Sequence, residues 1–292
     1  SNLDHPTYVT DNTIYKIKWL IRNILFNQKK ILFFLKNRFF SLLNKVLEIK
    51  PNFYLKCGSI SNEYEKRKGV KILNGHSRDY NMYIKTKNIN FNSKDTKKYG
   101  LFLESVTPIH NIGDAYILGD ESNYRGSAKK WLNSLNHFFN QIEQALKIKI
   151  FIVPHPKIKH LEKFSQLYNG REILREKLPV VSKKTELIIA RDSTGFSFAA
   201  IHKKPSIFVF NNELLNLNNN FIKNQKQFAK ALGQNPVNMD KNFSKNEITD
   251  LLKFNKSSYE NYIKLYHSSR NDHKTNIEIL EENFISENFI KS

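Results

Sequence analysis

The sequence predicts an α/β fold built on a parallel sheet, and three observations support this prediction. Short apolar runs recur at Ile148–Val153, Leu187–Ala190 and Ser206–Phe210. A basic or amphipathic segment separates each run from the next, which is the alternation of strand and helix typical of parallel sheets. Polar and turn-forming residues directly follow the first two runs, at the strand ends where such sheets bind ligands.

The chain has 292 residues, which is enough for two domains. Segment 84–99 is rich in Asn, Ser, Asp and Lys and is typical of a linker. We therefore expect an N-terminal α/β domain over residues 1–96, with basic amphipathic helices. A C-terminal α/β domain over residues 97–292 is expected to end in helices.

Each remaining element follows from local pattern. Apolar residues at one- and two-turn spacing predict helices within 11–50, at 128–146 and over 245–287. In the last of these, Ser244 with Glu247 and Ser257 with Glu260 fit the spacing of a capping box. Short apolar runs predict strands at 53–59, 70–73 and 100–103, while residues 74–80 and the Asn- and Gln-rich segment 211–235 read as loops, the latter with short helical pieces.

The formal net charge of +20 favours anionic partners. No nucleic-acid-binding motif is present, so we expect no nucleic-acid partner. Residues 11–50 contain nine Lys or Arg and two Asp or Glu among apolar residues at helical spacing. Such helices either pack on their own domain or dock on an anionic membrane surface. Cys57 is the single cysteine, and no apolar stretch is long enough to span a bilayer. We expect a cytoplasmic protein, peripheral on the inner face of the membrane if the helices dock.

Two strand ends carry candidate phosphate-binding groups. His155 and Pro156 follow the run that ends at Val153, and Ser193, Thr194 and Gly195 follow the run that ends at Ala190, where a helix begins. Unpaired N–H groups and a partial positive charge at a helix N-terminus favour phosphate. Neither GxxxxGK[ST] nor GxGxxG occurs, which argues against a P-loop ATPase and a dinucleotide enzyme.

Glu104 follows the strand at 100–103, and a loop with His110 and Asn111 comes next. These three residues, with His76 and Arg171, are further candidates for substrate contact. Each also has a structural interpretation: a helix-capping acid, a residue of a solvated loop or an exposed cation.

The order of these motifs resembles the carboxyl half of bacterial sialyltransferase-like enzymes, which include transferases for Kdo and other nonulosonic acids of surface carbohydrates. The resemblance covers roughly residues 70–210. It rests on an acidic segment, an HP motif and an S/T motif, namely Phe102-Leu103-Glu104-Ser105, Ile152-Val153-Pro154-His155-Pro156, Gly170-Arg171-Glu172-Ile173, Thr185-Glu186-Leu187-Ile188, Ser193-Thr194-Gly195, Ala199 and Lys204-Pro205.

The resemblance implies a GT-B fold, in which two Rossmann-like domains face a cleft that holds a CMP-activated keto sugar acid. It implies an inverting transfer to a hydroxyl of a surface glycan or lipid-linked glycan, with no metal site and no cofactor. Glu104 would be the general base, His155 would assist the departing phosphate, and Ser193 and Thr194 would bind it. The chain departs from the family at two positions. Ser105 stands where the acidic motif has its second acid, and the acid Asp192 directly precedes the S/T motif.

Three other functions remain open. Asn111-Ile112-Gly113-Asp114 resembles a segment of polysaccharide pyruvyltransferases, although it lies mid-chain here. Another GT-B-like transferase, such as a CMP-releasing glycerophosphotransferase, is the second. The third is a basic, membrane-associated binding protein without enzymatic activity, in which changes at Glu104 and His155 leave its binding activity intact.

Overall fold

The structure is a computed structural model that describes residues 35–40, 42–43, 53–60, 69–90, 98–104, 128–155, 164–217 and 219–286. The chain divides into two compact units. The larger contains Lys56–Ile60 and the described residues from Asn74 onwards, and the smaller contains the described residues of Tyr8–Leu55 and Ser61–Leu73. The expected domain boundary after residue 96 lies outside the described residues and stays a prediction.

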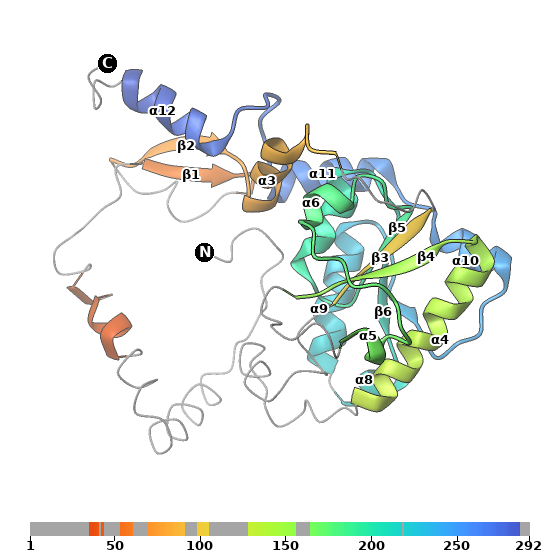
Figure 1. The fold of residues 1–292 in the computed structure, drawn as a ribbon. Helices are drawn as coiled ribbons and strands as arrows, with labels where there is room; N and C mark the ends of the chain where they lie inside the picture. Colours follow the sequence, from red (N-terminus) through yellow and green to blue (C-terminus); the bar gives the residue numbers. More distant parts are fainter. Residues whose placement is uncertain are drawn as a thin grey trace. The chain divides into compact units, whose positions relative to one another are not determined.

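A five-stranded parallel sheet forms the centre of the larger unit (Figure 1). Its strand order is β4-β3-β5-β6-β7. The strands are β3 (Tyr99–Leu103), β4 (Lys149–Val153), β5 (Leu187–Ala190), β6 (Ser206–Phe210) and β7 (Val237–Asn238). The predicted α/β class with a parallel sheet is therefore confirmed. A separate two-stranded sheet pairs β1 (Phe53–Cys57) with β2 (Lys71–Gly75).

The strand order creates a switch point between β3 and β5. From β3 the chain first adds β4 on one side, and then crosses to add β5, β6 and β7 on the other. Counted from β3, this is the 2-1-3-4-5 order of flavodoxin-like doubly wound sheets. Ligands of such sheets bind outside the carboxyl ends of the strands, where the winding direction reverses.

Helices connect the strands and continue after the sheet. They are α3 (Arg78–Thr86), α4 (Ala128–Leu146), α5 (Phe164–Leu167), α6 (Leu178–Val181), the 3₁₀ helix η2 (Thr194–Phe196), α7 (Ser197–Ile201), α8 (Asn212–Leu217), α9 (Asn219–Ala231), α10 (Lys245–Leu251), α11 (Lys256–Tyr266) and α12 (Asn276–Ser286). Neighbouring parallel strands need crossovers of this kind, because the chain must return to the same end of the sheet before the next strand begins.

The sheet has a hydrophobic core on each face, as its sequence pattern requires. All five residues of β3 are buried, and alternate residues serve opposite faces: Leu101 and Leu103 belong to one core, whereas Phe102 belongs to the other. The Leu101 face packs against α6, α7, α9 and α11, and the Phe102 face packs against α4 and α10. Burial on both faces explains why the strands read as continuous apolar runs.

Three local expectations are corrected. Residues 78–86 form α3 rather than a loop, with Ser77 as its N-cap. The Asn- and Gln-rich segment forms the 13-residue α9, because Phe228 and Ala229 are buried in the core and tertiary packing outweighs low helix propensity. The capping box of Ser244 and Glu247 is confirmed, whereas the N-cap of α11 is Asn255, two residues before the expected Ser257.

Candidate functional site

The carboxyl ends of β3, β4 and β5 lie at a common level. Leu103 is in register with Val153 on one side and with Ala190 on the other. The backbone N–H of Glu104 donates to the carbonyl oxygen of Val153 at 3.0 Å. Glu104 therefore lies between the loop that contains His155 and the loop that begins at Arg191. The prediction that these motifs follow strands of the same sheet is confirmed.

Glu104 is buried beside two large polar side chains that the sequence did not single out. Its side chain lies at the sheet edge with an exposure of 2% for the residue, and Tyr168 is fully buried. Burial raises the pKa of the Tyr168 hydroxyl well above its ordinary value, and the negative charge of Glu104 raises this pKa further. Arg191 acts on the same hydroxyl in the opposite direction, by its positive charge. Glu104, Tyr168 and Arg191 therefore form one buried polar cluster.

Arg191 is a fully buried cation. Its Nε donates to Asp192 Oδ1 at 3.1 Å and its Nη2 donates to Asp192 Oδ2 at 3.2 Å. The guanidinium carbon lies 5.4 Å from the ring centroid of Trp131 on α4, which is a cation–π arrangement. The pairing with Arg191 explains how an acid can precede Ser193 at a predicted phosphate site. The guanidinium balances the negative charge of Asp192, which therefore repels a nearby anion less.

The segment after Asp192 is held in a tight turn. Ser193 is the N-cap of η2, and its Oγ accepts a hydrogen bond from the backbone N–H of Gly195 at 3.3 Å. The hydroxyl hydrogen of Ser193 can still be donated to a ligand. Thr194 is exposed and Ser193 and Gly195 are half-buried. The short helical segment that follows consists of three 3₁₀ residues and the five residues of α7, so the contribution of a helix dipole is small.

Gly195 has a packing role that the sequence did not reveal. A Cβ at this position would lie 2.6 Å from Leu178 Cδ2 and 3.3 Å from Leu103 Cδ1. Its φ is not positive, so the glycine is required by close contact with α6 and β3 and not by backbone conformation. The missing side chain lets the turn pack directly on the end of the sheet.

His155 is half-buried and lies two residues after the end of β4. Pro156, His110 and Asn111 lie outside the described residues, as does the segment that resembles pyruvyltransferases. The structure thus brings Glu104, His155 and Ser193–Gly195 to one edge of the sheet, with Glu104 in the middle.

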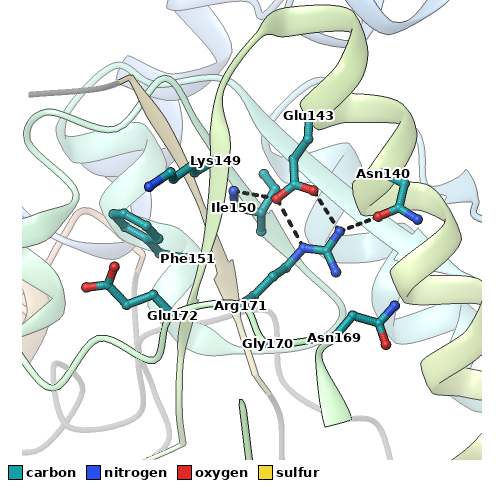
Figure 2. Close-up of a pocket in the computed structure, with 9 residues that line it drawn as sticks. All are labelled: Asn140, Glu143, Lys149, Ile150, Phe151, Asn169, Gly170, Arg171 and Glu172. Atoms are coloured by element: carbon teal, nitrogen blue, oxygen red, sulfur yellow. Dashed lines mark hydrogen bonds and ion pairs between the residues drawn. The ribbon is translucent and has the colours of Figure 1, made fainter. Parts of the chain in front are cut away.

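Arg171 has a different environment from the one expected of a substrate-binding cation (Figure 2). Its side chain is 8% exposed and forms an ion pair with Glu143 of α4, with Nη2 at 2.7 Å from Oε2 and Nε at 3.1 Å from Oε1. Further donors reach Asn136 Oδ1 at 2.9 Å, Asn140 Oδ1 at 2.6 Å and the carbonyl oxygen of Tyr168 at 3.2 Å. Arg171 therefore ties the turn after α5 to α4.

A pocket of about 410 Å³ lies beside this ion pair and not at the carboxyl edge. Its lining includes Lys149, Ile150 and Phe151, the first three residues of β4, together with Glu143 and Arg171 (Figure 2). Because β4 runs from Lys149 to Val153, the pocket opens near the end of the strand opposite to His155. The pocket and the predicted site are separate features.

His76 is a structural residue. It is 1% exposed, its Nδ1 is 2.8 Å from Ser268 Oγ, and its Nε2 is 3.0 Å from the carbonyl oxygen of Lys274. Its backbone N–H donates to Asn276 Oδ1 at 2.8 Å. Burial lowers the pKa of the imidazole. Both ring nitrogens are hydrogen-bonded to other residues of the larger unit, so His76 is not part of the candidate site.

Among the described residues, no group of three or more His, Cys, Asp or Glu side chains is arranged to hold a metal ion. The residues that sequence reasoning missed are Tyr168, Arg191 and Trp131. A signal for one of them was available, because Arg191 follows four fully buried residues, where a charged side chain requires a partner. Tyr168 and Trp131 carried no local signal, since aromatic residues at such positions are usually ordinary core residues.

No protein-family model and no curated protein matches the chain. Solved structures of similar fold include the UDP-GlcNAc 2-epimerase of Methanocaldococcus jannaschii in complex with UDP-GlcNAc and UDP, with a TM-score of 0.39 and 16% identity over 73% of this chain and 60% of that one. The S. aureus MnaA–UDP co-structure has a TM-score of 0.37 and 14% identity over 76% and 56%. Acinetobacter baumannii MurG has a TM-score of 0.36 and 12% identity over 84% and 68%.

The chain spans less than two thirds of the length of the first two of these proteins. TM-scores of this size do not indicate a function. The α/β fold class is assigned from the five-stranded parallel sheet and its helices.

Proposed function

We propose that the chain is an inverting glycosyltransferase that moves a keto sugar acid from a CMP-activated donor to a hydroxyl of a surface glycan. One observation carries the proposal: the residues that resemble the HP and S/T motifs follow β4 and β5, on either side of β3, at the winding switch of a doubly wound sheet. Doubly wound sheets bind nucleotides at this place. The two motifs lie on either side of it, because β4 is added on one side of β3 and β5 on the other.

The donor side of the proposed reaction uses the loops after β4 and β5. A keto sugar leaves its phosphate through a cation-like transition state, so negative charge gathers on the departing phosphate oxygens. The half-buried His155 donates a hydrogen bond or a proton to that phosphate, and Ser193 and Thr194 donate from their hydroxyls. In Ser193 the oxygen is already fixed by the N–H of Gly195, which orients the hydroxyl before the donor arrives.

The acceptor side needs a base. In the proposed step the acceptor oxygen forms a bond to the anomeric carbon, the bond to the phosphate oxygen breaks with its electron pair, and the acceptor proton passes to a carboxylate. The resemblance gives this role to Glu104, and that role stays a prediction. The charges of Glu104 and Arg191 both act on the buried Tyr168 hydroxyl, which supports an additional role in which the carboxylate helps to balance the charge of the loop after β5.

The proposed donor is tested by differential scanning fluorimetry of the chain with CMP, UDP, GDP and ADP, one at a time. At a concentration of one hundred times Kd, a nucleotide stabilises the fold by about 2.7 kcal/mol. For a domain of this size that corresponds to a rise in Tm of roughly 5–10 °C. We expect this rise with CMP and not with GDP or ADP. UDP is the informative competitor, because it is also a pyrimidine nucleotide.

Selective stabilisation by UDP would replace the CMP donor with a UDP-sugar, and no stabilisation by any nucleotide would overturn the proposal. The variants His155→Ala and Ser193→Ala should lose most of the CMP-induced rise, while the Tm of the free Ser193→Ala variant falls by only roughly 2–4 °C through loss of the N-cap. Lys203→Ala is the matched control, because Lys203 is exposed and its ion pair with Glu260 lies on the surface. The same CMP response in this control and in the wild type attributes the loss to the site.

A further inference from the structure

The described helical residues 35–40 and 42–43 carry exposed apolar side chains. Leu35 is 57% exposed, Phe39 is 60% exposed and Leu42 is 57% exposed. We name these three residues the apolar stripe. Phe40 is 47% exposed as well. Single exposed apolar residues are ordinary on protein surfaces, whereas several on one side of a helix indicate a contact surface.

The positions of these residues follow from helix geometry. At about 100° per residue, Leu35, Phe39 and Leu42 fall within a sector of roughly 60°. At the same spacing, Lys36 lies about 60° beyond one border of this sector and Arg38 about 40° beyond the other. The Nζ of Lys36 lies 5.9 Å from the ring centroid of Phe40, which lies outside the stripe. The stripe therefore has a cation on each side.

We infer that this helix docks in the plane of an anionic lipid leaflet, with the apolar stripe inserted and Lys36 and Arg38 at the level of the headgroups. The two flanking cations can bury their stems and keep their charges at the phosphate layer. A second copy of the chain fits this surface less well, because it would bring the cations of two stripes together. An anionic leaflet attracts the nine cations of residues 11–50, whereas a neutral or basic protein partner does not.

The wider segment supports a lipid leaflet as the occupant. Residues 11–50 contain nine Lys or Arg against two Asp or Glu. Each Lys or Arg near an anionic leaflet adds about 1 kcal/mol of attraction, and the attraction extends over about one Debye length. Across the described part of the chain, no helix combines the length and the apolar character that crossing a bilayer demands. The inference does not rest on the proposed function.

Co-sedimentation of the full chain with lipid vesicles tests the inference. The vesicles are pure phosphatidylcholine, or phosphatidylcholine with about one third phosphatidylglycerol, at low salt and at 0.5 M NaCl. We expect binding to the anionic vesicles at low salt, weaker binding at high salt because surface charges are screened, and little binding to phosphatidylcholine. Failure to bind the anionic vesicles, or equal binding to both kinds, would overturn the inference.

The apolar part is tested with Phe39→Gln/Leu42→Gln, which keeps good helix formers at both positions. The partition coefficient on anionic vesicles should fall by about tenfold or more, since two large apolar side chains no longer enter the leaflet. The matched control is Ile277→Gln/Ile285→Gln on α12, where both residues are 53% exposed. Equal losses in the two double variants would show that the stripe is not the docking surface.

The cationic part is tested with Lys36→Gln/Arg38→Gln, for which binding should fall by about 30-fold, at about fivefold for each charge. Lys245→Gln/Lys256→Gln removes the same net charge from exposed positions on α10 and α11 and should change binding much less. Light scattering coupled to size exclusion completes the test. A dimer that Phe39→Gln/Leu42→Gln converts to a monomer would show that the stripe binds a second copy, which would overturn the inference.

Discussion

Replacing Arg171 by Met should destabilise the larger unit and leave nucleotide binding unchanged. Removing one partner of a buried ion pair costs about 3–5 kcal/mol. Glu143 retains the backbone N–H of Ile150 at 2.9 Å, and its side chain is 26% exposed, so water compensates part of the loss. We therefore expect a loss of about 3 kcal/mol, to which the broken hydrogen bonds with Asn136 and Asn140 contribute. This loss corresponds to a fall in Tm of roughly 6–12 °C.

The assay is thermal and urea unfolding, followed by titration of the folded variant with CMP. Arg175→Met is the matched control, because Arg175 is an exposed arginine four residues further along the same segment. It should change stability by less than about 0.5 kcal/mol. An Arg171→Met variant with the Tm of the wild type and a weakened affinity for CMP would refute the structural role. It would support the substrate-binding role that the sequence suggested.

Three further predictions concern the sheet edge and its surroundings. Arg191→Met should lower stability by about 3–5 kcal/mol, because it leaves the Asp192 carboxylate, 9% exposed, without the guanidinium, and unfolding in urea measures this. Gly195→Ala should lower stability by about 1–3 kcal/mol, because the added Cβ would clash with Leu178. Leu178→Ala in the same chain should remove the clash and restore the turn, which the rise in Tm with CMP would report. Burial lowers the pKa of His202 to about 4, so the unfolded chain gains a proton near pH 6.5 that the folded chain does not. Stability should therefore be about 2 kcal/mol lower at pH 5 than at pH 7 from this residue, and His202→Gln should remove that difference.

Each of these has a contrary result. Wild-type stability in Arg191→Met would show that the cation is not needed to balance the carboxylate. A double variant at Gly195 and Leu178 that is no better than Gly195→Ala alone would show that the glycine does not serve packing. Equal pH dependence in the wild type and in His202→Gln would place the titration elsewhere, for example at His76, whose pKa is also lowered by burial.

Most strands could be predicted because a strand buried on both faces has a continuous apolar sequence. The predicted runs at Leu187–Ala190 and Ser206–Phe210 coincide with β5 and β6, and the helix at 128–146 coincides with α4. The two-residue β7 has no apolar run and was missed. Strand order could not be predicted, because it depends on which face each crossover helix covers, and apolar residues on α4 and on α6 look alike in the sequence.

The site was predictable only where it depends on strand ends. Register is a property of the sheet, so His155 and Ser193 had to lie at one edge once their strands were recognised. The partners of Arg171 were not predictable, since Glu143 lies 28 residues away on α4 and the bond depends on how that helix packs. His76 was misjudged for the same reason: its partners Ser268 and Lys274 come from the other end of the chain.

A fully buried arginine at the carboxyl edge of the sheet requires a reason, because removing its charge from water is expensive. The reason lies in the position of the turn from Asp192 to Gly195. On the α4 face of the sheet, Arg191 is held over Trp131 and grips Asp192 with two nitrogens. On the opposite face, Gly195 packs against Leu178 and Leu103. Ser193 lies between these two anchors with its oxygen already bonded. Under the proposed function, a hydroxyl held in this way loses little freedom when it binds the phosphate, so the buried charge would contribute to binding by fixing the turn before the donor arrives.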